Sequence, residues 1–173
     1  MAAHVDAIAQ DLAYANAGAE KAHSMVAEAD AYVQRSVDAA ARGGFVAMAA
    51  NLGAAQQQLR ELHAVLHETR RELAEAAAPV ANAPKEIDAE QVVVLLGPLT
   101  GQVDKVRGGL TRALGQVPPV VQRIAASANQ SPAIGILTNV QQQVLAQVLQ
   151  RVGAVTQTIS AALADAKAAQ AGG

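Results

Sequence analysis

A seven-residue apolar repeat runs along the first 41 residues and constrains the fold more than any other feature of this 173-residue chain. Apolar or small residues recur at two positions of each heptad, which is typical of helices that pack against one another along a seam. One column holds Val5, Leu12, Ala19, Val26, Val33 and Ala40, and the other holds Ile8, Ala15, Ala22, Ala29 and Ser36. The repeat therefore predicts one long helix over residues 4–41.

A second helix of similar length is predicted directly after a glycine turn. Gly43 and Gly44 interrupt the repeat, because glycine adopts the left-handed conformations that end helices at little cost. The repeat resumes over residues 45–78 and stops at Pro79, since proline lacks the amide hydrogen that a helix interior needs. Its two columns hold Phe45, Leu52, Leu59, Leu66 and Leu73, and Met48, Ala55, Leu62, Thr69 and Ala76. Two such helices joined by a short turn predict an antiparallel hairpin over residues 1–78.

The remaining residues, 79–173, show a more interrupted helical pattern. Asp88 and Gln91 have the spacing of a helix N-terminal capping box, and Ser131-Pro132 is a second helix start. The expected elements are a linker at 79–88 and then, within 89–173, a Gly- and Pro-broken helix to residue 115, a short helix from Pro118 to Ala128, and a long helix from Ser131 to about Ala169. Each interior glycine costs about 1 kcal/mol relative to alanine, so the broken helix needs a neighbouring surface to hold it.

The last helix carries an apolar stripe that is wider than one neighbouring helix covers. Its polar face is mostly glutamine rather than charge, which suits contact with another protein chain. Contiguous apolar surface of this kind usually marks an interface, so we expect an oligomer or an obligate helical partner. The predicted contact residues are Val144, Val148, Val152, Val155 and Ile159. The alternative is that the N-terminal hairpin folds back and covers the stripe within the chain.

Composition predicts an all-α, coiled-coil or helical-bundle protein and excludes several functions. Aromatic residues make up 2% of the chain while alanine supplies 42 residues, and sheets depend on aromatic and β-branched pairs. Cysteine is absent, which excludes disulfides and Cys-based zinc sites. The net charge of −2, without a basic face or stacking aromatics, disfavours nucleic-acid binding.

The sequence predicts no catalytic residue, cofactor or metal. His63 and His67 have the i, i+4 spacing that lets two imidazoles reach one metal, but Ala64 stands where a zinc protease carries its glutamate. No third ligand accompanies them, so we interpret both as residues flanking the leucine seam. Phosphate loops, nucleophile elbows and dinucleotide fingerprints are also missing, and we expect a protein that is not an enzyme.

The N-terminus and the apolar runs bear on localisation. Residues 1–6 lack the basic and apolar regions of a classical signal peptide, and the longest apolar run, residues 92–96, is far too short to span a membrane. We expect a cytoplasmic protein, or one exported without a classical signal peptide.

Residues 1–78 resemble the small helical hairpins exported by type VII secretion systems in actinobacteria. The likeness lies in two equal helices and a glycine-containing turn near residue 43. Those proteins carry Trp-x-Gly in the turn, where this chain has Gly43-Gly44-Phe45, and their Tyr-x-x-x-Asp/Glu motif has no counterpart here. The resemblance implies a homo- or heterodimeric helical bundle that is exported as a folded pair.

Together these features favour a non-enzymatic structural or scaffolding protein that acts through protein–protein association. Two alternatives stay open. One is a leaderless, type VII-like secreted effector or its partner. The other is an amphipathic coat protein of a lipid or polymer inclusion, although helices that lie on such surfaces usually bring Phe or Trp and a Lys/Arg-rich face.

Overall fold

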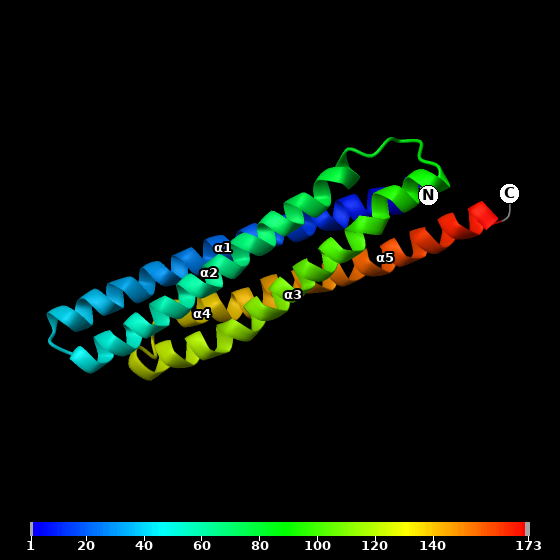
Figure 1. Ribbon diagram of the computed structural model, residues 1–173. Coiled ribbons are helices and arrows are strands. Elements are labelled where there is room, and N and C mark those ends of the chain that lie inside the picture. Colours follow the sequence, from blue (N-terminus) through cyan, green and yellow to red (C-terminus); the bar gives the residue numbers. More distant parts are fainter. Residues whose placement is uncertain (1, 172–173) are drawn as a thin grey trace.

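The computed structural model describes residues 2–171 and shows four long helical stretches packed side by side (Figure 1). The elements are α1 (Ala2–Arg42), α2 (Val46–Ala81), α3 (Ala89–Ser127), and a fourth stretch made of α4 (Pro132–Asn139), the π-helical segment η1 (Val140–Leu145) and α5 (Ala146–Ala171). Successive stretches run antiparallel, and the described residues form no strand. The all-α helical-bundle prediction is confirmed.

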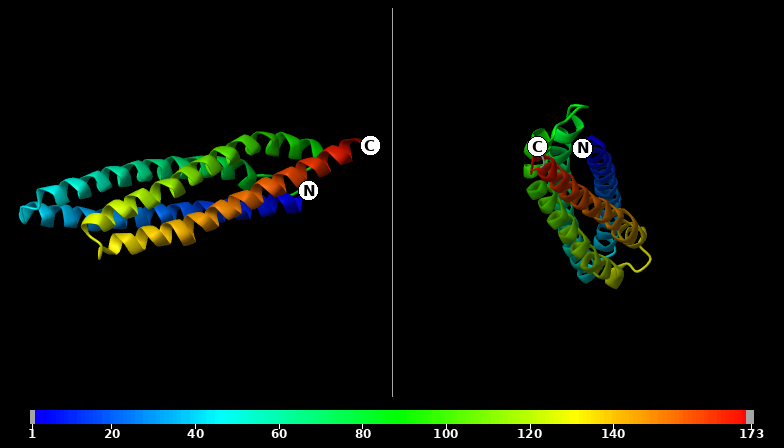
Figure 2. Two further views of the ribbon diagram at one scale, coloured as in Figure 1. Left: turned by 90° about the horizontal axis from the view of Figure 1, so that it is seen from below. Right: turned by 90° about the vertical axis from the view of Figure 1, so that its right-hand side faces the viewer.

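The four stretches form a closed ring around one core. Contacts join α1 to α2, α2 to α3, α3 to α5, and α5 back to α1. With 41 residues, α1 alone is about 60 Å long at 1.5 Å per residue, so the bundle is a rod. Both chain ends lie at the same end of the rod, opposite the α1–α2 turn (Figures 1 and 2). The N-terminal hairpin therefore packs against a second hairpin of the same chain.

The heptad columns predicted the buried face of the first hairpin well. Every column residue of α1 is buried except Ser36, which is partly buried. The turn closes because Gly44 has a φ of +74°, which lets the Phe45 amide donate to the Ala40 carbonyl at 2.9 Å. Two column residues of the second helix, Phe45 and Met48, are exposed instead of buried. The first hairpin extends beyond the α3–α4 turn, so the second hairpin does not cover this end of it (Figures 1 and 2).

The prolines do not end helices where the sequence suggested. α2 passes through Pro79 and ends at Ala81, where the side-chain amide of Asn82 donates to the Ala78 carbonyl at 2.8 Å. α3 continues through Pro98, Pro118 and Pro119, although we expected a break at Pro118-Pro119. The apolar row of α3 is buried without interruption against the neighbouring helices, and this packing offsets the lost backbone hydrogen bonds. The row consists of Val92, Leu96, Leu99, Val103, Val106, Leu110, Ala113, Val117, Val120 and Ile124.

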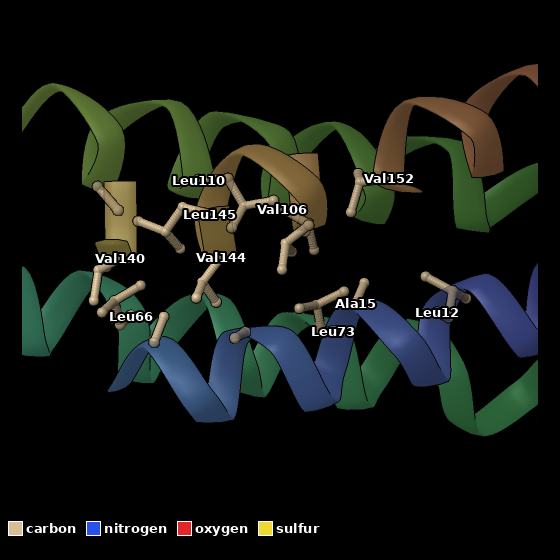
Figure 3. Close-up of a cluster of buried hydrophobic side chains, with 14 of the residues drawn as sticks. Leu12, Ala15, Leu66, Leu73, Val106, Leu110, Val140, Val144, Leu145 and Val152 are labelled. Carbon is tan, nitrogen blue, oxygen red and sulfur yellow. The ribbon is translucent and has the colours of Figure 1, made fainter. Parts of the chain in front are cut away.

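The predicted helix starts are confirmed by their capping hydrogen bonds. The Gln91 amide donates to the Asp88 carboxylate at 2.8 Å, and the Asp88 amide donates to the Gln91 side-chain oxygen at 3.1 Å. The Ala133 amide donates to the Ser131 hydroxyl at 3.3 Å. The sequence did not reveal the π-helical segment η1. Its wider turn places two consecutive residues, Val144 and Leu145, in the core (Figure 3).

Candidate functional site

The apolar stripe of the last helical stretch lies inside the bundle, which corrects the predicted interface. Val144 is 7% exposed, and Val148, Val152, Val155 and Ile159 are 1% exposed or less. Figure 3 shows Val144 and Val152 pointing into the space between the helices. The neighbours that cover the stripe are α1 and α3 of the same chain. This is the fold-back alternative, and it leaves these five residues no surface to offer to a second chain.

A histidine cluster lies between α1 and α2. His23 of α1 meets the two histidines of α2: its ring centroid is 4.7 Å from that of His63, at an interplanar angle of 84°, and 6.4 Å from that of His67. His23 does not stand out in the sequence, because it lies 40 residues from His63. His23 could have been found by aligning the two helices as an antiparallel hairpin, because that alignment places His23 opposite residues 63–67. Within residues 2–171, no group of three His, Cys, Asp or Glu side chains is arranged to hold a metal ion.

Partial burial disfavours the charged forms of His23 and His63. Burial lowers the pKa of His23 below its ordinary value of 6.5, and the positive charges of His63 and Arg70 lower it further. Burial also lowers the pKa of His63, although the nearby Asp30 carboxylate acts in the opposite direction. The described residues place no serine, threonine or lysine nucleophile in hydrogen-bond contact with these rings. The cluster is therefore a packing contact between α1 and α2 in which burial disfavours protonation of His23 and His63.

An apolar surface, which we call the tip, lies at the α1–α2 turn. It consists of Phe45, Val46 and Met48, whose exposed fractions are 64%, 78% and 37%. The Phe45 ring lies over Gly43, because a β-carbon added to that glycine would be 2.7 Å from the ring. The nearest charged residue along the chain is Arg42, which forms no ion pair within residues 2–171. The tip is thus an apolar knob with one free positive charge beside it.

An apolar groove lies at the opposite end of the rod, between the end of α2, the linker and the first turns of α3. Its volume is about 520 Å³, and most of its lining is apolar. Val94 stands at the groove with 71% of its surface exposed. The lining residues are Pro79, Pro84, Ile87, Glu90, Gln91, Val94, Leu95, Pro98, Leu99 and Gln102. The sequence predicts that these prolines interrupt helices. It does not predict the groove, which forms only where the end of α2, the linker and the start of α3 come together.

Comparisons of this chain with protein families, curated proteins and solved structures gave no match. In the part of the chain that the structure describes, no helix combines the length and the apolar character needed to cross a membrane.

Proposed function

We propose that this protein is a non-enzymatic helical scaffolding protein that acts by associating with other protein surfaces. The tip is the observation that supports this proposal. Within residues 2–171, five large apolar side chains are exposed, and three of them, Phe45, Val46 and Met48, gather in four consecutive residues. A chain that buries its apolar rows so completely leaves its single Phe in water at a protruding end. Exposed apolar clusters of this kind usually mark protein interaction sites.

The rod-shaped bundle supports the same proposal. Each helix is covered by its neighbours, so the body of the rod is a rigid spacer and its apolar ends are the places for contact. A coat for a lipid or polymer inclusion is less well supported, because the amphipathic faces lie inside the bundle and a coat protein would have to open it.

A leaderless, type VII-like effector is the second candidate. Its support is the hairpin of α1 and α2 with the Gly43–Gly44 turn. The second hairpin of the same chain completes the bundle here, so the seam of the first hairpin needs no second protein to cover it. Detection of the intact chain in the medium of unlysed producing cells would favour this candidate.

Site-specific photo-crosslinking in the producing cells tests the scaffolding proposal. A photoreactive phenylalanine analogue at position 45 should form covalent protein adducts, because position 45 lies in the proposed contact. The control places the same analogue at Tyr14, an aromatic residue that is 46% exposed and lies in the N-terminal half of α1, away from the α1–α2 turn. Substituting Val46→Ser and Met48→Ser should remove the adducts at position 45. If position 45 gives no more adducts than position 14, the proposal fails.

A further inference from the structure

The tip and the groove are two apolar features at opposite ends of one rod, and no other part of residues 2–171 covers either of them. The tip projects beyond the α3–α4 turn, while the groove lies beside the α2–α3 linker near both termini (Figures 1 and 2). One is convex and the other is concave. A second copy of the chain therefore presents to each feature a surface of the opposite shape.

The size of the groove suits the side chains of the tip. Its volume of about 520 Å³ lies in the range of clefts that bind small apolar groups. A fully covered aromatic side chain buries roughly 150–250 Å² of surface. Phe45 is 64% exposed, so seating it in the groove would bury more than half of that area. Val46 and Met48 lie beside it and extend the knob along the groove.

The charges of the two ends are also complementary. Residues 84–91 beside the groove contain Lys85, Glu86, Asp88 and Glu90, for a net charge of 1 − 3 = −2, while residues 41–51 at the tip contain Arg42 alone. Neither Arg42 nor Glu90 forms an ion pair among residues 2–171. Glu90 lines the groove itself, so a tip seated there brings Arg42 toward a free carboxylate. Opposite charges at the rim of a contact favour the correct register.

Other pairings leave part of this surface uncovered. A tip-to-tip dimer would place two Arg42 side chains together and leave both grooves open. A small apolar molecule in the groove would leave the tip in water. We infer that the tip of one copy seats in the groove of the next, so that the chain associates with itself head to tail. This inference rests on the proposed scaffolding function and names its partner as a second copy.

A head-to-tail contact has two physical consequences. The assembly keeps one free tip at one end and one free groove at the other, so growth is open-ended. The contact is also small, because it consists of one knob and one groove. Contacts below about 1,200 Å² of total buried surface are usually weak. The mean mass of the assembly should therefore rise with protein concentration across the range of roughly 10 µM to 1 mM.

Sedimentation velocity with complementary variants tests the inference. The tip variant carries Phe45→Ser and Val46→Ser, and the groove variant carries Val94→Lys, which also repels Arg42. All three positions are exposed, so the fold should survive, and circular dichroism checks this. Wild type should grow in mean mass with concentration, while each variant alone should stay at the 17.6 kDa of one chain.

Mixing the tip variant with the groove variant tests the head-to-tail contact most directly. The tip variant keeps its groove and the groove variant keeps its tip, so an equimolar mixture should form a dimer of twice the 17.6 kDa chain mass and grow no further. Tyr14→Ser is the control and should assemble like wild type. A mixture that stays monomeric, a wild type that stays monomeric at 1 mM, or loss of assembly in Tyr14→Ser would each overturn the inference. The crosslinking experiment in cells tests the scaffolding proposal separately. If the chain does not associate with itself, adducts of position 45 with a different protein would still support the scaffolding proposal.

Discussion

Two adjacent glycines of α3, Gly108 and Gly109, should respond to alanine with opposite signs. Gly108 is exposed and a β-carbon added there meets nothing within 4 Å, so Gly108→Ala should stabilise the fold by about 0.5–1 kcal/mol. Gly109 is buried, and a β-carbon there would lie 2.3 Å from the Thr69 hydroxyl oxygen and 3.4 Å from its β-carbon. α2 and α3 approach each other this closely because Gly109 has no side chain.

The expected loss of stability in Gly109→Ala depends on how little the Thr69 side chain can move. It is buried and β-branched, and its hydroxyl donates a hydrogen bond to the Val65 carbonyl at 2.8 Å. A new methyl group must therefore separate the helices by about 1 Å or break that bond. Overpacking of this kind costs about 1–3 kcal/mol. The gain in helix propensity is the same for both glycines, so the free energies of unfolding of the two variants should differ by about 1–3 kcal/mol.

Denaturant unfolding followed by circular dichroism measures this difference. Thr69→Ala removes the obstructing atoms, so Gly109→Ala in that background should become as favourable as Gly108→Ala, which a double-mutant cycle reports as a coupling energy. If Gly108→Ala and Gly109→Ala raise stability equally in the wild-type background, α2 and α3 do not approach each other closely at Gly109.

Two further predictions concern the core and the histidine cluster. Leu66→Ala truncates a fully buried side chain and should lower the free energy of unfolding by about 2–5 kcal/mol. Val94→Ala lies on the exposed surface and should change it by less than about 0.5 kcal/mol. Equal effects of the two variants in chemical denaturation would contradict the assignment of Leu66 to the buried seam. Stability should also fall as the pH drops from 7 toward 5. Burial lowers the folded-state pKa of His23 and His63 below 6.5, so the unfolded chain binds protons first as the solution becomes acidic. His23→Gln combined with His63→Gln should flatten this dependence in thermal melts across that range, and an unchanged slope would exclude the cluster as its cause.

The sequence by itself determined that nearly the whole chain is helical, where the helices begin, and which face of each helix is apolar. The columns built on Leu12 and Leu59, the positive φ at Gly44, and the caps at Asp88 and Ser131 are properties of a few neighbouring residues. Periodicity and capping act within one or two turns, so they can be deduced without knowing what lies opposite. These local signals were sufficient for the all-α bundle.

The tertiary structure decided which neighbour covers each face. The sequence predicts that the stripe at Val144–Ile159 binds another chain, yet α1 and α3 cover it. Phe45 fits the heptad pattern but stands in water, because its hairpin extends past the other. The proline-containing α3 stays continuous for the same kind of reason, since its packing lies on residues far away in the chain. Such outcomes depend on the relative lengths and register of helices distant in sequence. No local pattern records that information, which is why Gly108 and Gly109 look alike in the sequence and only one of them lies against Thr69.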